Sequence, residues 1–155
     1  MHKTTRLRGL LVGGTIWVGL AAVAATSVSV AQIPLPPKDP NQNQVYLVRK
    51  DASNCTNSDV PNVDSPLVGG NVWVTRASDG NTHVKVAMTA TPSTTYHFFL
   101  KCVRLLNDIT TDSEGVANVT VSFPTNSVGN VYAFDMYPEG APSGNKYQSA
   151  QVTFQ

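Results

Sequence analysis

The sequence predicts an all-β fold, an antiparallel Greek-key β-sandwich of about seven strands. Three observations lead to this prediction. After residue 45, apolar and polar residues alternate in short segments, turn-forming residues separate those segments, and beyond the N-terminal 31 residues no stretch keeps a helical period of about 3.6 residues over three turns. Each segment is apolar on one face only, so a parallel α/β sheet, whose strands are apolar on both faces, does not fit.

The N-terminus has the composition of an export signal. One lysine and two arginines precede an uncharged, largely apolar run, residues 10–30. Small residues at Ser29 and Ala31 stand where signal peptidase requires them, which predicts a signal peptide of residues 1–31, cleaved between Ala31 and Gln32. An uncleaved membrane anchor is the alternative, since an apolar helix of this length would cross a bilayer core of about 30 Å.

Charge and length narrow the class of protein. The chain has 155 residues, and removal of residues 1–31 leaves 124, the size of one domain. Eight basic and ten acidic residues then remain, a net charge of −2, so nucleic acid is not an expected partner. We expect a secreted or periplasmic monomer that has no contact with the membrane once the signal is removed.

The expected elements follow in order along the chain. Residues 32–44 are rich in Pro, Asn and Gln and form a linker, because four prolines exclude a helix or a central strand. The β-sandwich domain then covers residues 45–155, and a polar, turn-rich loop occupies residues 50–66. The expected strands are residues 45–49, 71–77, 82–89, 96–102, 117–123, 131–137 and 147–154.

Alternation assigns the faces of these strands, and turn residues assign their ends. One face carries Val72 and Val74, then Val84, Val86 and Met88, then Tyr96, Phe98, Leu100 and Cys102, then Ala117, Val119, Val121 and Phe123. Gly80 and Gly115 each close a turn that begins with acidic and polar residues. Pro124 ends a strand because it has no N–H for the ladder.

Two cysteines remain after the signal, Cys55 and Cys102. In an exported chain an even pair predicts one disulfide bond. Two free thiols in a metal or redox site are the alternative. Neither cysteine belongs to a C-x-x-C motif, and no histidine lies at a spacing typical of zinc ligands.

Three motifs resemble those of immunoglobulin-like and fibronectin type III domains. The stretch from Thr91 to Tyr96 resembles their Pro-x-Thr-x-Tyr corner, in which the tyrosine hydroxyl bonds to nearby backbone. Trp73 is similar to the core tryptophan of such folds, and residues 111–117 resemble hairpins of secreted bacterial sandwich modules. The resemblance implies an immunoglobulin-like module and no catalytic residue. Some 59 residues follow Tyr96, more than the two strands that the fibronectin pattern would place there.

No arrangement in the sequence predicts a catalytic residue, a metal ligand or a cofactor. His83 and His97 lie on expected solvent faces, and neither has an evident nucleophile and orienting acid beside it. One alternative is a small exported hydrolase whose scattered acids meet only in the fold. The other is a periplasmic metal-binding protein, in which Met88 and Met136 join the histidines around copper, or loop aspartates gather a calcium ion.

We therefore expect an exported, non-catalytic binding or structural module. Tyr132, Phe134 and Tyr137 are candidate binding residues, because aromatic side chains on the exposed face of a sheet would form a platform for a protein or glycan ligand. A surface-assembly subunit is a further alternative, which would need an open sheet edge that accepts a strand. Residues 147–154, next to the C-terminus, are the expected edge.

Overall fold

The computed structural model describes residues 39–64, 68–140 and 145–155. The predicted signal peptide, the cleavage point between Ala31 and Gln32, and residues 32–38 of the predicted linker lie outside the described residues. Within the described part of the chain, no helix is long and apolar enough to cross a membrane.

The described residues form ten strands and one short 3₁₀ helix, and every strand pair is antiparallel. The fold is therefore all-β, as predicted. The strands are β1 (Gln42–Arg49), β2 (Val68–Arg76), β3 (Asn81–Thr89), β4 (Thr95–Leu100), β5 (Arg104–Thr110), β6 (Val116–Pro124), β7 (Val131–Tyr132), β8 (Phe134–Pro138), β9 (Tyr147–Ser149) and β10 (Val152–Thr153), and the helix η1 is Thr125–Ser127.

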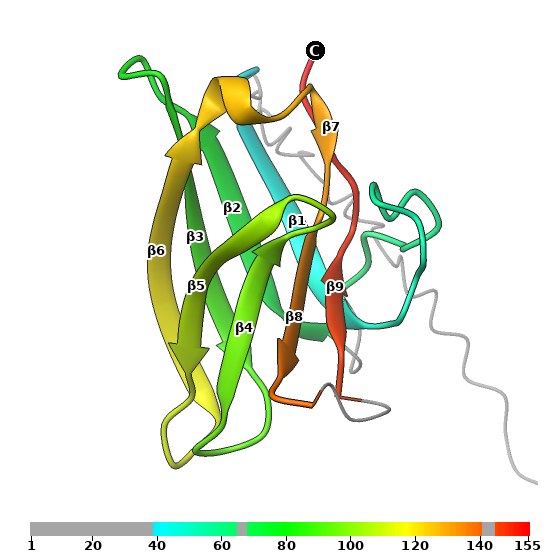
Figure 1. Ribbon diagram of the computed structural model, residues 1–155, viewed down its shortest axis with the longest axis vertical. Coiled ribbons are helices and arrows are strands. Elements are labelled where there is room, and N and C mark those ends of the chain that lie inside the picture. Colours follow the sequence, from blue (N-terminus) through cyan, green and yellow to red (C-terminus); the bar gives the residue numbers. More distant parts are fainter. Residues whose placement is uncertain (1–38, 65–67, 141–144) are drawn as a thin grey trace, which may run out of the picture. The chain divides into compact units, whose positions relative to one another are not determined.

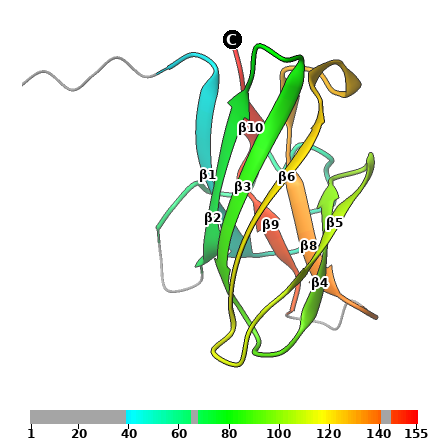
Figure 2. The same cartoon turned by 90° about the vertical axis from the view of Figure 1, so that its left-hand side faces the viewer.

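Eight of these strands form a single curled sheet in the order β5-β4-β8-β9-β1-β2-β3-β6, and β10 pairs with β7 alone. The sheet curls so strongly that its edge strands, β5 and β6, approach each other and nearly close a barrel (Figure 1). Seen from the side, β1, β2, β3 and β6 form one half, and β9, β8, β4 and β5 form the other (Figure 2). This arrangement differs from the predicted seven-stranded Greek-key sandwich in its strand number and in its one continuous sheet.

The core fills the space between the two halves. Alternate residues of β3 and β4 point into it, as the sequence predicted, and Phe98 stacks on Phe134 with ring centroids 5.2 Å apart. The fully buried residues include Leu47, Val72, Val74, Val84, Val86, Tyr96, Phe98, Leu100 and Met136. Period-two alternation identified these positions, apart from Leu47 and Met136, because it is a local property of any half-buried strand.

Both predicted turns are present. In each, an aspartate side chain accepts backbone N–H groups that the turn leaves free: Asp79 from Asn81 at 2.8 Å, and Asp112 from Val116 at 2.8 Å. The glycine that follows each aspartate, Gly80 or Gly115, has a φ of 83°. Side chains other than glycine rarely adopt this conformation.

The tyrosine hydroxyl of the predicted corner makes the expected hydrogen bond. The backbone N–H of Thr91 donates to the hydroxyl of Tyr96 at 3.2 Å, and that hydroxyl donates to Oδ1 of Asn145 at 3.0 Å. Trp73, by contrast, is not a core residue. It lies half-buried on the outer face of β2, with Nζ of Lys85 5.5 Å from its ring centroid.

β5 was not predicted, and the strand before it is shorter than predicted. β4 ends at Leu100, and Cys102 lies exposed in the following turn with a φ of 60°. β5 has no alternating pattern, because its pairing with β4 shifts register after Phe98 and Ile109 is its one buried residue. At the other end of the chain, β1 begins at Gln42, inside the predicted linker.

Candidate functional site

The loop between β1 and β2 lies against the outer side of the sheet, next to β9 (Figure 1). Its buried residues Ala52 and Val60 pack with Val48 of β1 in a second, small hydrophobic cluster. The predicted disulfide joins this loop to the turn after β4. The Cα atoms of Cys55 and Cys102 are 5.6 Å apart, and both side chains lie at the surface.

Next to the disulfide, the loop covers a lysine. Lys101 is only 7% exposed, because its side chain runs beneath the loop. Its backbone N–H donates to the carbonyl of Ala133 and holds the main chain against the sheet. Its Nζ donates to the carbonyl of Ala52 and to Oδ1 of Asn57, both at 2.6 Å, and lies 3.7 Å from Oδ1 of Asp135. A buried ammonium group requires partners of this kind, because burial of an unpaired charge is very costly.

The partners of Lys101 are themselves held in place. Asn57 is fully buried, adopts a φ of 49°, and its Nδ2 donates to the carbonyl of Ser149 at 3.0 Å. Gln148 of β9 binds both backbone groups of Ala52: its Oε1 accepts from the N–H at 2.5 Å and its Nε2 donates to the carbonyl at 3.1 Å. We call Asn57, Lys101, Asp135 and Gln148 the Lys101 cluster.

Asp135 is the least satisfied member of the Lys101 cluster. It is 9% exposed, and within the described residues its Oδ1 has no hydrogen-bond partner. Burial raises the pKa of Asp135 above its ordinary value, while the positive charge of Lys101 opposes this rise. A buried carboxyl oxygen without a protein partner is rare in folded proteins, and it accompanies a bound water or ion, stored strain or a chemical role.

A second feature lies on the outer face of β4 and β8. Phe99 stacks on Tyr137 with ring centroids 4.9 Å apart, and His97 meets Phe99 edge to face at 6.4 Å. Nζ of Lys146 lies 5.3 Å from the centroid of Tyr137. We call His97, Phe99, Tyr137 and Lys146 the aromatic face. All four side chains are half-buried, and β4 and β8 hold those of His97, Phe99 and Tyr137 in place while part of each remains in contact with solvent.

Two carboxylates hold the imidazole of the aromatic face. Nδ1 of His97 lies 2.7 Å from Asp108 on β5, and its Nε2 lies 3.0 Å from Glu139. These two hydrogen bonds raise the pKa of His97 above its ordinary value, with the larger effect from Asp108. The acids approach different ring nitrogens and therefore do not converge on one point.

The structure separates the predicted binding residues. Tyr132 and Phe134 belong to the core, with 4% and 0% exposure, so the prediction that they form an exposed platform is wrong. Tyr132, Phe134 and Met136 do share one face, as the alternation predicted, but this face points into the core and not to solvent. Tyr137 does lie on the outer face, where its neighbour is Phe99 of the adjacent strand.

The residues proposed for a metal site lie apart. Met88 and Met136 are in the core, whereas His83 and His97 are on outer faces. In residues 39–64, 68–140 and 145–155, no group of three or more His, Cys, Asp or Glu side chains is placed to hold a metal ion. Two of the loop aspartates already have partners: Asp59 accepts from Asn54 at 2.7 Å, and Asp51 pairs with Lys146 at 2.9 Å.

The expected open edge at residues 147–154 is paired on both sides over β9 and on one side over β10. β9 lies between β8 and β1, and β10 pairs with β7. β1 does lack a strand partner on one side before Leu47, but the side chain of Asn62 occupies this edge: it accepts from the N–H of Tyr46 at 2.9 Å and donates to the carbonyl of Gln44 at 3.3 Å. An amide group thus replaces the backbone of a neighbouring strand, which protects the edge from pairing with other chains.

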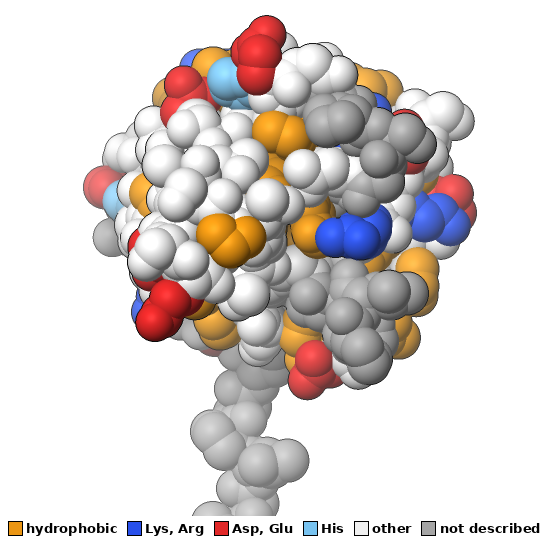
Figure 3. Space-filling model, turned by 90° about the horizontal axis from the view of Figure 1, so that it is seen from below, with side chains coloured by type: hydrophobic (Ala, Val, Ile, Leu, Met, Phe, Trp, Pro, Cys, Tyr) orange, Lys and Arg blue, Asp and Glu red, His pale blue; other side chains and the backbone are white. Residues whose placement is uncertain are grey.

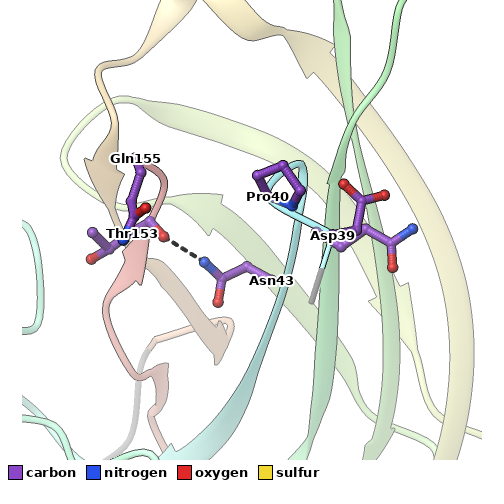
Figure 4. Close-up of a pocket in the computed structure, with 6 residues that line it drawn as sticks. Asp39, Pro40, Asn43, Thr153 and Gln155 are labelled. Atoms are coloured by element: carbon purple, nitrogen blue, oxygen red, sulfur yellow. Dashed lines mark hydrogen bonds between the residues drawn. The ribbon is translucent and has the colours of Figure 1, made fainter. Parts of the chain in front are cut away.

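An open recess of about 270 Å³ lies between the start of β1 and the C-terminus. Figure 4 shows the amide of Asn43 directed across this recess, where it donates to the carbonyl of Thr153 at 2.6 Å. The recess is lined by Asp39, Pro40, Gln42, Asn43, Thr153 and Gln155. It holds a single carboxylate and no aromatic ring, so its lining offers little basis for specific recognition.

The lower end of the domain, seen in Figure 3, is covered mainly by uncharged polar groups and backbone, with hydrophobic side chains in small separate groups. Scattered apolar side chains of this kind are normal at protein surfaces and identify no interface.

Comparison with known proteins gives no family for this chain. No protein-family model matches it, and no curated protein is significantly similar to it. The function is therefore inferred from the side chains themselves.

Proposed function

We propose that this protein is an exported, non-catalytic binding or structural module of the immunoglobulin-like type, and that its ligand contacts the aromatic face. The observation that carries the proposal is the Phe99–Tyr137 stack, which β4 and β8 hold at the surface between an imidazole and an ammonium group. Aromatic rings fixed by a sheet offer apolar area at a low entropic cost and are enriched at binding surfaces.

The aromatic face offers polar contacts around an apolar centre. Asp108 and Glu139 provide acceptors at one end, where Glu139 is almost fully exposed. Lys146 provides a donor at the other end, where it also pairs with Asp51 at 2.9 Å. A glycan that stacks on the rings, or a protein loop with an aromatic or cationic side chain, would match this pattern.

Two observations support the immunoglobulin-like type. The hydrogen bond from Thr91 to Tyr96 has the form of the tyrosine corner in such domains, and the two halves of the sheet pack face to face around one core. Export is supported by the disulfide, since disulfides persist in oxidising compartments outside the cytoplasm.

A binding experiment tests the role of the aromatic face. Purified protein is applied to a glycan array and to cell-envelope extract with a chemical cross-linker, and the double variant F99A/Y137A is compared with W73A. Trp73 is the matched control, because it is also a half-buried outer-face ring next to a lysine but lies on the other half of the sheet. We expect F99A/Y137A to lose capture and W73A to retain it. Equal capture by all three proteins, or no capture at all, contradicts the proposal.

The structural alternative is favoured by a different observation. The disulfide and the Lys101 cluster attach the 50–64 loop to the sheet at adjacent points, as expected of a module that must keep its shape under mechanical load or protease attack. A protease that cleaves the oxidised protein within this loop as fast as it cleaves the unfolded protein contradicts this alternative.

A further inference from the structure

We propose that the side chains of Lys101 and Asn57 join in an intramolecular amide bond, and that Asp135 transfers the protons in this reaction. The bond would link Nζ of Lys101 to the side-chain carbonyl carbon of Asn57, with loss of one ammonia molecule. The proposal does not rest on the proposed ligand, because none of these three side chains belongs to the aromatic face.

The reacting atoms are already close together. Nζ of Lys101 lies 2.6 Å from Oδ1 of Asn57. A carbonyl bond is about 1.2 Å long, so the distance from Nζ to the carbon of that carbonyl is at most about 3.8 Å. Reacting atoms in productive complexes lie about 3–3.5 Å apart, so a small rotation of the lysine side chain completes the approach.

Burial favours amide-bond formation over hydrolysis of the Asn57 side chain by water. Asn57 and Lys101 are 0% and 7% exposed, so bulk water has little access to the carbonyl carbon. Proximity in a fixed geometry replaces a bimolecular encounter, which is worth an effective concentration of about 10⁵ M or more for well-oriented groups. An amide and an amine that do not react in dilute solution can therefore react here.

The amide of Asn57 is oriented from both sides. Its Nδ2, the atom that would leave, donates to the carbonyl of Ser149 at 3.0 Å, and its Oδ1 accepts from Lys101. The left-handed backbone conformation of Asn57 and the neighbouring disulfide at Cys55 fix the main chain around it. The carbonyl group cannot turn away from the lysine without loss of these contacts.

The reaction balances without any other reactant. Proton transfer from the Lys101 ammonium group to Asp135 leaves a neutral amine and a protonated carboxyl group. The amine lone pair forms the N–C bond, and the carbonyl electrons move to Oδ1, which the carboxyl group of Asp135 stabilises. When the C–Nδ2 bond breaks, Nδ2 accepts one proton from the carboxyl group of Asp135 and leaves as ammonia, while the attacking nitrogen returns one proton to Asp135. The released ammonia takes up this last proton, and Asp135 ends as a carboxylate. No atom is oxidised or reduced.

Asp135 suits this role for two reasons. Its Oδ1 lies 3.7 Å from Nζ of Lys101 and has no hydrogen-bond partner in the described structure. Burial raises its pKa, so the neutral, proton-donating form is more accessible than for an aspartate in water. An open recess of about 170 Å³, lined in part by Lys101, Cys55 and Cys102, gives the released ammonia a route to solvent.

Mass spectrometry of the full exported chain tests the proposal. We expect the reduced protein to be lighter than its sequence by one ammonia, in addition to any loss from cyclisation of an N-terminal Gln32. Peptide mapping separates these two events. Trypsin does not cut after a modified lysine, so the bond predicts one branched peptide that joins residues 51–76 to residues 86–104 and that survives reduction. Recovery of residues 51–76 as a free peptide of unmodified mass overturns the proposal.

Variants then assign the roles. Lys101→Arg keeps a positive charge but has no amine that can form this amide, and we expect the full mass and no branched peptide. Asp135→Asn removes the proton carrier, and we expect the branched peptide to fall at least tenfold. Lys146→Arg is the matched control, because Lys146 also pairs with an aspartate but lies far less buried. A branched peptide in Lys101→Arg contradicts the role of Lys101, and a wild-type level of branched peptide in Asp135→Asn contradicts the role of Asp135. If a variant fails to fold, the peptide map of the wild type still shows whether the amide bond forms.

Discussion

The backbone N–H of Thr91 donates to the hydroxyl of Tyr96 across 3.2 Å, and this bond connects the end of β3 to the start of β4. The same hydroxyl donates to Asn145 near the start of β9. Tyr96 therefore anchors two chain reversals at the same end of the domain while its ring fills the core.

Tyr96→Phe removes both hydrogen bonds and leaves the ring in place. We expect the free energy of unfolding to fall by about 1–2 kcal/mol, because two modest hydrogen bonds are lost and Thr91 lies where water can replace one of them. Urea titration measures this change. Tyr46→Phe is the control, because the described structure shows no hydrogen bond to the Tyr46 hydroxyl. Equal midpoints for the two variants would show that the corner contributes nothing to stability.

The contribution of the disulfide depends on the proposed amide bond. Cys55 and Cys102 are 47 residues apart, and closure of such a loop stabilises a fold by about 4 kcal/mol in the chain-entropy model. In Lys101→Arg we expect reduction to lower the free energy of unfolding by about this amount. In the wild type the amide bond closes nearly the same loop, so we expect a much smaller loss. Urea titrations with and without reductant measure both values, and equal losses contradict the coupling.

His97 makes stability depend on pH. Because Asp108 and Glu139 raise its pKa in the folded state above the unfolded value of about 6.5, the protonated ring stabilises the fold below that pH. This contribution is lost as the pH rises through the folded pKa. We therefore expect Asp108→Asn to lower the pKa of His97 in an NMR titration, and to destabilise the protein more at pH 5 than at pH 9. A pKa of His97 that does not respond to Asp108→Asn contradicts this account.

Asn62 protects the open part of β1. Asn62→Ala removes the acceptor of the Tyr46 N–H and the donor to Gln44, so we expect faster hydrogen exchange at the Tyr46 amide and a cost of about 1 kcal/mol. Exchange measured by NMR checks the first expectation. Sedimentation at high concentration shows whether the freed edge pairs between chains. Asn126→Ala, at an exposed position of η1, provides the control, and an unchanged exchange rate at Tyr46 in Asn62→Ala would refute the role of Asn62.

The strand faces could be predicted because their cause is local. Side chains alternate along any strand, so the buried positions Val84, Val86 and Met88 were visible in the sequence alone. The Asp79 and Asp112 turns were visible for the same reason, since the hydrogen bonds that the two aspartate side chains accept from the backbone span four residues or fewer.

No comparable local signal indicates whether the second, partly apolar face of a strand points inward or outward. Trp73 and Tyr132 are both aromatic residues in alternating segments, yet Trp73 points outward and Tyr132 points into the core. Their strands have apolar residues on both faces, and only the curl of the sheet decides which face is enclosed. β5 was missed because its shifted register interrupts the alternation.

By itself, the sequence determined the all-β class, the strand periodicity, the two turns and, through its two cysteines, the disulfide. The tertiary structure alone decided that the strands form one curled sheet, that Phe99 meets Tyr137, and that Lys101 lies beneath a loop beside Asn57, which is 44 residues away. The physical reason is distance along the chain: periodicity and turns depend on neighbouring residues, whereas a buried polar cluster exists only where separate segments meet and exclude water.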